Sequence, residues 1–383
     1  MPDIYDYMRW RGDLGIQQDG FNEVDNLILS VFSYVPLEEI VPDAYGSGIT
    51  IGDAAREFAE NKKLWKRLRV QEDKRLFAEI GQCPRFAGLL LHCHASILSA
   101  HEEKQFSAVS IGVGDGSLFV SYRGTDTTLV GWKEDFNMSF LRQVPAQADA
   151  VAYLENIAAK FDGPLRVGGH SKGGNLAVYA SAFCARSVQD RVVAVYNNDG
   201  PWLHADMVKK PGYAAIRERI HAFIPQTSII GMLFENEEQY TVVRSNQTGI
   251  FQHDFYSWEV LGTRFVSLAA ITNSSMFVDH TITSWLSEWD EEQRALFVDT
   301  LFTIVSATGA QTFQELGGKW RSSTLAMLKS IVALDKDMRA ALARTLKLLV
   351  RAACKHWPDI APPLLAGSTL KDKALAPLRK GRS

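Results

Sequence analysis

The stretch LRVGGHSKGGNLAVYASAFC, residues 165–184, holds the pentapeptide GHSKG at 169–173, which fits the pattern G-x-S-x-G. Residues 165–167 predict a strand before the pentapeptide, and the run from Asn175 onward predicts a helix after it. Glycines at a sharp strand-to-helix turn let the backbone pass close by, and the turn exposes the serine hydroxyl at the carboxyl edge of a sheet. This context favours Ser171 as a nucleophile over the alternative, a glycine-rich helix start in which Ser171 is the N-cap.

Strand and helix patterns alternate on both sides of this turn. Two short β-branched and aromatic runs, 107–113 and 117–124, are joined by Gly-Asp-Gly and predict a hairpin. Further strands are predicted at 165–170, 191–199, 220–225 and 239–245, and helices at 146–161, 172–186 and 212–220. This alternation predicts an α/β fold with a mostly parallel central sheet flanked by helices.

Both ends of the chain show helical patterns instead. In the N-terminal part, helices are predicted at 24–31, 54–68 and 86–103. Long helical patterns with polar faces return after residue 270, and the tail is rich in proline, glycine and basic residues. We therefore expect an N-terminal helical segment, 1–105, that packs on a core of residues 106–270, and a C-terminal helical segment, 271–383, with a mobile tail.

Composition excludes several classes of protein. The 383-residue chain has a formal net charge of −3 and no large basic field, which argues against a nucleic-acid partner. No apolar run approaches the roughly 20 residues needed to cross a bilayer, and the first residues lack the apolar core of a signal peptide. The four cysteines form no C-x-x-C pair, so we expect neither a disulfide framework nor a zinc site, and a cytoplasmic location. In the HCH segment, His92–His94, adjacent side chains point to different sides, so we expect helix packing rather than metal binding.

A nucleophilic serine needs a base, an orienting acid and hydrogen-bond donors for the oxyanion. In folds with such a serine turn, the acid and then the histidine follow the serine along the chain. Three downstream histidines are candidates for the base: His204, His221 and His253. His221 falls inside a predicted strand and His204 in a predicted loop, whereas His253 lies in a loop directly after the last predicted strand. We favour His253 as the base; the alternative is a solvent-exposed loop histidine.

The carboxylate that would orient the histidine has a weaker sequence signal than the serine. Asp199 ends the strand that follows the nucleophile helix, and a Gly-Pro pair stops that strand abruptly. A carboxylate at this strand end can reach the loop that bears His253, so we favour Asp199 over its alternative role as a turn aspartate bonded to its own backbone. The rival acids are Asp254, Glu235 and Glu237.

The segment before the nucleophile, residues 119–140, fits a loop that binds an oxyanion. A predicted strand ends there near Arg123, which we expect to be a structural ion-pair residue. The N–H of Thr125 is the natural second oxyanion donor beside the N–H of Lys172, the residue after the serine. Residues expected to lock this loop by hydrogen bonding are Asp126, Trp132, Glu134 and Asp135.

These motifs resemble known lipases. The segments YRGTD and GWKEDF within 122–136, followed by GGHSKGGNLA at 168–177, resemble the class 3 (fungal-type) lipases. Together with NNDGP at 197–201 and HDFYSW at 253–258, they are similar to an uncharacterised bacterial lipase-like α/β-hydrolase family. The resemblance covers residues 20–265 and implies an α/β-hydrolase fold.

The resemblance also implies roles for single residues. It implies Ser171 as nucleophile, His253 as base, and the N–H groups of Thr125 and Lys172 as oxyanion donors. Class 3 lipases place the acid after the strand that corresponds to residues 219–225, where this chain has no carboxylate. The NNDGP segment instead resembles the pancreatic-type lipases, whose acid lies one strand earlier, and this difference supports Asp199.

The motifs together predict a serine hydrolase of lipase or esterase type that cleaves carboxylic esters through an acyl-enzyme, without a cofactor or metal. Its substrate would be a small-molecule or lipid ester. The alternatives are a thioesterase or acyltransferase with the same three residues, or a non-catalytic binding protein of the same fold. The apolar segments 201–208 and 229–234 are either lids or packing helices. The Lys172 ammonium either favours an anionic substrate or faces solvent, and the oligomeric state stays open.

Overall fold

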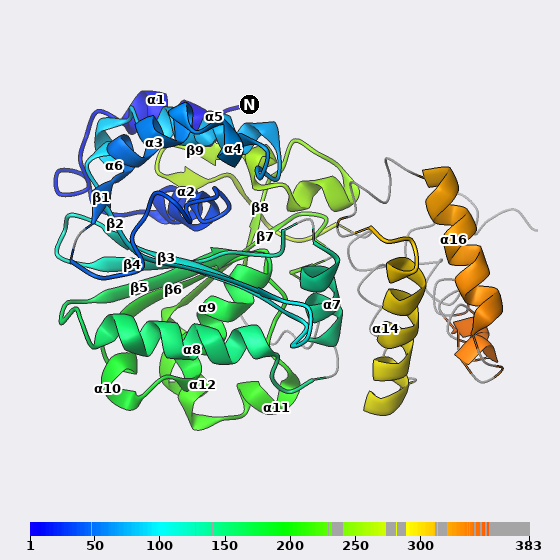
Figure 1. The fold of residues 1–383 in the computed structure, drawn as a ribbon. Helices are drawn as coiled ribbons and strands as arrows, with labels where there is room; N and C mark the ends of the chain where they lie inside the picture. The colour runs from blue at the N-terminus through cyan, green and yellow to red at the C-terminus, as the bar shows by residue number, and fades with distance from the viewer. Residues whose placement is uncertain are drawn as a thin grey trace, which may run out of the picture.

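The computed structural model describes residues 1–46, 48–126, 128–138, 141–228, 230–231, 240–272, 281, 289–310, 312, 320–334, 336, 338–340, 342–344, 347–348 and 351. A nine-stranded sheet with the order β1-β2-β3-β4-β5-β6-β7-β8-β11 runs through the described part of the chain, and helices cover both of its faces (Figure 1). The α/β class predicted from the sequence is therefore confirmed.

The strands of this sheet are β1 (Ile49–Thr50), β2 (Leu90–Ser99), β3 (Lys104–Gly112), β4 (Leu118–Tyr122), β5 (Leu165–His170), β6 (Val192–Asn198), β7 (Ile220–Pro225), β8 (Tyr240–Val243) and β11 (Ser267–Leu268). Strands β9 (Val260–Leu261) and β10 (Arg264–Phe265) form a separate pair. The run from β4 to β8 is parallel, whereas β1 to β4 and the β8–β11 pair are antiparallel. The sheet is therefore mixed and not mostly parallel, because short connections join β2 to β3 and β3 to β4 as antiparallel neighbours.

The helix expected at 86–103 is wrong. This segment forms β2, which pairs with β3 from Leu90 to Ser99 across a bulge between His92 and Ala95. Cys93 lies in the bulge with a φ of 53° and is buried. A short apolar run such as this one is compatible with a buried strand and with a buried helix, so periodicity alone does not separate the two.

One face of the sheet is covered by the N-terminal helices α1 (Ile4–Arg11), α2 (Glu23–Phe32), α3 (Ile51–Glu60), α4 (Lys62–Trp65), α5 (Gln71–Ile80) and α6 (Pro84–Ala87) (Figure 1). Helix α2 lies directly on β4 and β5, and its N-cap Asn22 accepts hydrogen bonds from the first turn. Nine of its ten residues are buried, so it is a core helix. Its buried polar residues are paired: Asp25 lies 2.6 Å from Arg85, and Asn26 donates to Asn198 at 2.9 Å. Its Leu27 shares one hydrophobic core with Val109 and Phe119 of the sheet.

The opposite face is covered by α8 (Pro145–Ala158), α9 (Lys172–Phe183), α10 (Arg186–Gln189), α11 (Ala205–Val208) and α12 (Pro211–Ile216). A second core joins these helices to the sheet and includes Val120, Leu154, Val167 and Leu176. Helix α9 contacts β4, β5 and β6, so the turn between β5 and α9 is fixed from both the sheet and the helix layer.

Beyond one end of the sheet, α7 (Leu129–Asn137) packs against the C-terminal helix α14 (Glu291–Ser306), and α16 (Trp320–Ala333) packs on α14 (Figure 1). Leu129, Val298 and Phe302 form a small apolar cluster there, and Lys133 Nζ lies 2.7 Å from Asp299 Oδ1. Within the described residues, no helix has the length and apolar character needed to cross a bilayer. The expected division into 1–105, 106–270 and 271–383 stays a prediction, and the expected mobile tail, residues 361–383, lies outside the described residues.

Candidate active site

Ser171 stands at the sharp turn between β5 and α9. Its backbone has φ 58° and ψ −133°, a strained combination for a residue with a side chain. Close backbone passage demands a glycine at position 173, because a Cβ there would lie 2.1 Å from the carbonyl oxygen of Tyr122. Ser171 occupies the N-cap position of α9, but its hydroxyl makes no capping hydrogen bond to the helix in the described structure.

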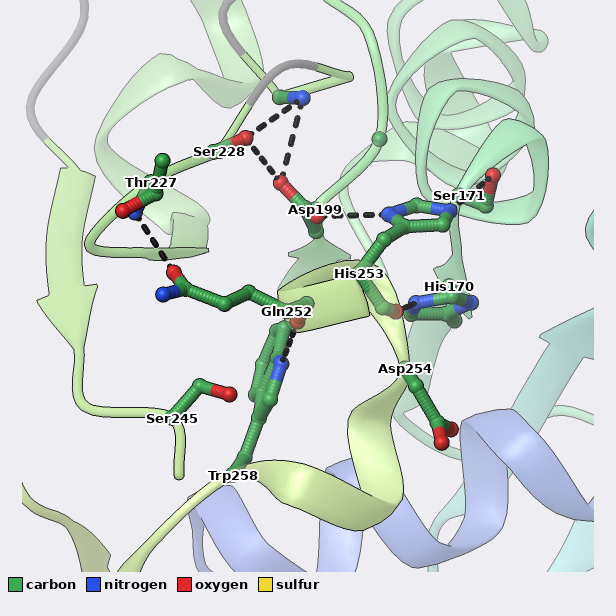
Figure 2. Close-up of polar contacts among 12 residues, drawn as sticks. His170, Ser171, Asp199, Thr227, Ser228, Ser245, Gln252, His253, Asp254 and Trp258 are labelled. Atoms are coloured by element: carbon green, nitrogen blue, oxygen red, sulfur yellow. Dashed lines mark hydrogen bonds and ion pairs between the residues drawn. The ribbon is translucent and has the colours of Figure 1, made fainter. Parts of the chain in front are cut away.

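The Ser171 hydroxyl meets His253 instead. His253 ends the 3-10 helix η2 (Gly249–His253), and its Nε2 lies 3.0 Å from Ser171 Oγ. Its Nδ1 lies 2.6 Å from Asp199 Oδ2, so the three side chains form one hydrogen-bonded series (Figure 2). The Asp199 side chain is 1% exposed and that of His253 is 27% exposed, so the carboxylate end of the series is buried.

Asp199 follows β6 with a φ of 51°. Because β5 and β6 are parallel neighbours, Asp199 and Ser171 lie at the same edge of the sheet. The other carboxylate oxygen, Oδ1, accepts hydrogen bonds from Ser228 Oγ at 2.5 Å and from the N–H of Gly231 at 3.2 Å (Figure 2). A Cβ at Gly231 would lie 2.4 Å from that oxygen, so the approach requires glycine.

Ser228 and Gly231 were missed by sequence reasoning. They lie after β7, in the turn where class 3 lipases are expected to carry the acid itself. Here that turn supplies hydrogen-bond donors to a carboxylate that comes from the preceding strand. The absence of a carboxylate between Pro225 and Ser228 was the available sequence signal.

Of the rival acids, Asp254 makes no contact with the imidazole of His253 in the described structure. Asp254 Oδ1 accepts a hydrogen bond from the N–H of Tyr256, at the start of η3 (Phe255–Ser257). Its carboxylate points away from the imidazole of His253 (Figure 2), and burial raises its pKa. Glu235 and Glu237 lie outside the described residues.

The other two candidate histidines have local roles. His204 is the N-cap of α11, where its Nδ1 accepts a hydrogen bond from the N–H of Asp206 at 3.3 Å. His221 lies on β7, and its ring stacks on Tyr196 with ring centroids 5.2 Å apart. Neither contact involves Ser171.

The loop that bears His253 is anchored by hydrogen bonds of the preceding residue, Gln252. The carbonyl of Gln252 accepts a hydrogen bond from Nε1 of the buried Trp258 at 2.9 Å. The side chain of Gln252 accepts another from the N–H of Thr227 at 2.7 Å (Figure 2). The segment that bears His253 is thus attached to the turn after β7, and His253 itself to Asp199.

The segment expected to bind an oxyanion lies against Ser171. A Cβ added to Gly124 would lie 3.1 Å from Cβ of Ser171. The hydroxyl of Thr125 donates to Asp135 Oδ2 and so fixes the loop. Among the described residues, the N–H groups of Thr125 and Lys172 have no backbone acceptor.

The second half of this segment is a helix and not a loop. Helix α7 begins at Leu129, after Thr128, whose hydroxyl accepts from the N–H of Gly131. The helix presents Asp135 to Thr125, and burial raises the pKa of Asp135 to about 6 although the Lys172 ammonium and the Thr125 hydroxyl oppose the shift. Of the other residues expected to lock the loop, Asp126 Oδ2 lies 3.5 Å from Arg123 Nη2, which agrees with a structural role for Arg123.

Both expectations for the Lys172 ammonium are wrong. The side chain is 1% exposed, and its Nζ lies 2.9 Å from Oε2 of the equally buried Glu134. Nζ also donates to the carbonyl and the side-chain oxygen of Gln105, at 2.9 and 3.0 Å. The ammonium therefore points into the protein, where it joins the nucleophile turn to β3 and α7, and it faces neither solvent nor substrate.

The segments expected to form lids are only partly described. Trp202 and Leu203 are buried, so the first half of 201–208 packs on the core. In the segment 229–234 only Ile230 and Gly231 belong to the described residues. In the part of the chain that the structure describes, no group of three or more His, Cys, Asp or Glu residues could hold a metal ion.

The model of the Mbeg1-like family matches residues 80–303, which is more than half of the chain. The chain belongs to the Mbeg1-like family. This family is described as lipase-like, which agrees with the lipase-like character expected from the motifs. The matched range of the Mbeg1-like family contains Ser171, Asp199 and His253 and begins after the N-terminal helices α1 to α4. No curated protein matches the chain.

Proposed function

We propose that this member of the Mbeg1-like family is a serine hydrolase of lipase or esterase type that cleaves carboxylic esters. The observation that carries the proposal is the series Ser171–His253–Asp199, with separations of 3.0 and 2.6 Å. A serine on a strained strand-to-helix turn, bonded to a histidine that is bonded to a buried carboxylate, is the arrangement that activates a hydroxyl for acyl transfer. The lipase-like description of the family supports the same class of reaction.

In the proposed mechanism, Ser171 Oγ attacks the ester carbonyl carbon while its proton passes to Nε2 of His253. Asp199 holds the imidazole by Nδ1 and stabilises the imidazolium that forms. The N–H groups of Thr125 and Lys172 donate to the tetrahedral oxyanion. Collapse of this intermediate releases the alcohol, which takes the proton from His253, and leaves an acyl group on Ser171. A water molecule activated by His253 then hydrolyses the acyl-enzyme by the same steps.

We further propose that the mixed sheet and its helices form an α/β-hydrolase core, with helical additions before and after it. Three features support this fold: the parallel run β4 to β8, the serine turn between β5 and α9, and an acid after β6 followed by a histidine after β8. The order serine, acid, histidine along the chain is the one typical of that fold. The substrate we propose is a small-molecule or lipid ester.

The test is labelling with a fluorophosphonate probe, which reacts with activated serines. We expect the wild-type chain to label at Ser171, and Ser171→Ala to abolish both labelling and ester hydrolysis. Equal labelling of wild type and Ser171→Ala, or no labelling of the wild type, would overturn the proposal. A series of p-nitrophenyl esters of rising acyl length then separates esterase from lipase, and a requirement for an acceptor other than water would identify an acyltransferase.

A further inference from the structure

We propose that Tyr34 and His170 are positioning residues for His253, and that they hold its backbone carbonyl through a two-step hydrogen-bond relay. The proposal rests on the proposed function, because the relay matters for a reaction only if His253 is the base. Tyr34 and His170 both act through the backbone from which the imidazole of His253 projects.

The relay begins at His170, which ends β5 immediately before Ser171. Its side chain is buried, and its Nε2 lies 2.9 Å from the backbone oxygen of His253 (Figure 2). Its Nδ1 lies 3.1 Å from the hydroxyl of Tyr34. The rings of His170 and His253 are 4.6 Å apart between centroids, so the two imidazoles are direct neighbours.

The chemistry of these partners fixes the proton on His170. A backbone carbonyl only accepts hydrogen bonds, so Nε2 of His170 must carry the proton that it donates to His253. In a neutral imidazole Nδ1 is then an acceptor, and the Tyr34 hydroxyl donates to it. The direction of the relay is therefore Tyr34 to His170 to the carbonyl of His253.

His170 and Tyr34 are both held in the protonation state that this direction requires. Burial, with the neighbouring His253 and Arg69, holds the pKa of His170 well below its usual range, so the ring stays neutral. Burial raises the pKa of the Tyr34 phenol, so the hydroxyl keeps its proton. A neutral His170 also avoids a second positive charge beside His253 when that residue becomes an imidazolium during acyl transfer.

Residues of the N-terminal segment pack against Tyr34 and against the loop that bears His253. The Arg69 guanidinium lies 4.9 Å from the Tyr34 ring and 5.2 Å from the ring of Phe255, two residues after the base. Its Nη2 lies 3.2 Å from Asp73 of α5, and Asp73 also accepts a hydrogen bond from the Tyr256 hydroxyl at 2.9 Å. Tyr34 and Arg69 both lie outside the matched range 80–303, so this part of the site is contributed by residues that the family match does not cover.

Kinetics of three variants test the positioning role. His170→Gln keeps an amide donor at about the reach of Nε2, whereas His170→Leu removes the donor, and Tyr34→Phe removes the hydroxyl. Fluorophosphonate titration counts the active sites, so that kcat refers to correctly folded protein only. We expect His170→Leu to lower kcat per titrated site about 10- to 100-fold with little change in KM, the loss typical when a group that orients a metal-bound histidine is removed. We expect His170→Gln to recover most of the loss and Tyr34→Phe to lose less than His170→Leu.

Tyr153→Phe is the matched control, because it removes another buried tyrosine hydroxyl, which donates to the carbonyl of Cys93 at 2.7 Å. We expect this change to lower stability without changing kcat per titrated site. Equal values of kcat for His170→Leu and His170→Gln, or losses confined to the number of titrated sites, would overturn the positioning role and leave His170 as a structural residue.

The protonation of His170 gives a readout that does not depend on activity. In ¹⁵N-labelled wild type and in Ser171→Ala, long-range ¹H–¹⁵N correlation spectra should show His170 with a protonated Nε2 and an unprotonated Nδ1. In Tyr34→Phe the Nδ1 resonance should shift because its donor is gone. A proton on Nδ1 in the wild type overturns the relay whether or not the protein hydrolyses esters. A wild type that shows the expected tautomer but does not label overturns the proposed function, and the catalytic role of the relay with it.

Discussion

The carboxylate of Asp199 lies 2.6 Å from Nδ1 of His253, although the two residues are 54 positions apart in the chain. Two separate features of the fold produce this contact. The parallel pairing of β5 and β6 brings Asp199 to the edge of the sheet where Ser171 stands. The attachment of Gln252 to Thr227 and Trp258 then brings the histidine loop over that edge. The contact therefore depends on the sheet and on the loop after β8 together.

Replacing Asp199 should leave the site folded but should abolish most of the proposed activity. Asp199→Asn keeps an acceptor and a similar shape, but it no longer stabilises an imidazolium on His253. We expect kcat to fall about 10⁴-fold, as for other orienting acids of this kind. Asp254→Asn is the matched control, because that carboxylate accepts only from the N–H of Tyr256 in the described structure. Esterase kinetics check the prediction, and a larger loss for Asp254→Asn than for Asp199→Asn would contradict it.

Removing the hydroxyl of Ser228 should weaken the hydrogen bonding that positions the carboxylate of Asp199. In Ser228→Ala, Oδ1 of Asp199 keeps the N–H of Gly231 but loses a donor at 2.5 Å. Because a hydrogen bond to a charged group contributes about 1.5–3 kcal/mol, we expect kcat to fall at least about tenfold. Ser181→Ala is the control, since that buried hydroxyl donates only to the carbonyl of Ala177 within its own helix. Equal kcat values for the two variants would refute a role for Ser228 at the acid.

Breaking the buried ion pair between Lys172 and Glu134 should lower the free energy of unfolding of the protein. Lys172→Met leaves the Glu134 carboxylate buried without its cation, and such a change typically costs about 3–5 kcal/mol of the free energy of unfolding. Adding Glu134→Leu to it removes the uncompensated charge, so we expect the double variant to recover part of the loss. Urea denaturation measures each value.

The control for this prediction is Arg186→Met, which breaks an exposed pair with Asp190 whose side chains are 69% and 55% exposed. Exposed pairs contribute about 0–1 kcal/mol. If Lys172→Met were no more destabilising than Arg186→Met, the Lys172 contacts would not support the turn.

Asp135 should make the stability of the protein depend on pH in an unusual direction. Burial raises its pKa from 3.8 to about 6, so between these values the folded state binds more protons than the unfolded state. Wild-type stability contributed by this group is therefore present below pH 3.8 and is lost as pH rises through 6. Asp135→Asn removes the titration and keeps an acceptor for Thr125.

We expect the free energy of unfolding of Asp135→Asn, relative to wild type, to rise by up to about 3 kcal/mol between pH 4 and pH 7. Denaturant titrations of both proteins across this range measure the difference directly. If the free energy of unfolding of Asp135→Asn relative to wild type fell with rising pH, the folded protein would stabilise Asp135 as the carboxylate, and the prediction would be wrong.

The parts of the fold that the sequence predicted well have a local signal. Strands β5 and β7 were predicted to the residue, because each is a short apolar run bounded by turn residues. The GHSKG turn likewise placed Ser171 between a strand and a helix. The order of Asp199 and His253 after it pointed to the residues that the structure brings together, and their catalytic roles stay predictions.

The parts that the sequence did not predict depend on contacts distant in the chain. Lys172 meets Glu134, 38 positions away, and nothing local indicates that the ammonium turns inward. Ser228 contacts Asp199, and His170 contacts the backbone oxygen of His253, through hydrogen bonds for which no residue pattern exists. The error at β2 has the same cause, since only its pairing with β3 makes that apolar run a strand.

Helix α2 limits how far the chain can be truncated at its N-terminal end. It lies on β4 and β5 with nine of its ten residues buried, yet it precedes residue 80, where the family match begins. A fragment expressed from residues 80–303 would leave Val109, Phe119 and their neighbours facing water. Large exposed apolar patches of this kind drive aggregation. We therefore expect a fragment cut at the family boundaries to precipitate, even though it retains Ser171, Asp199 and His253.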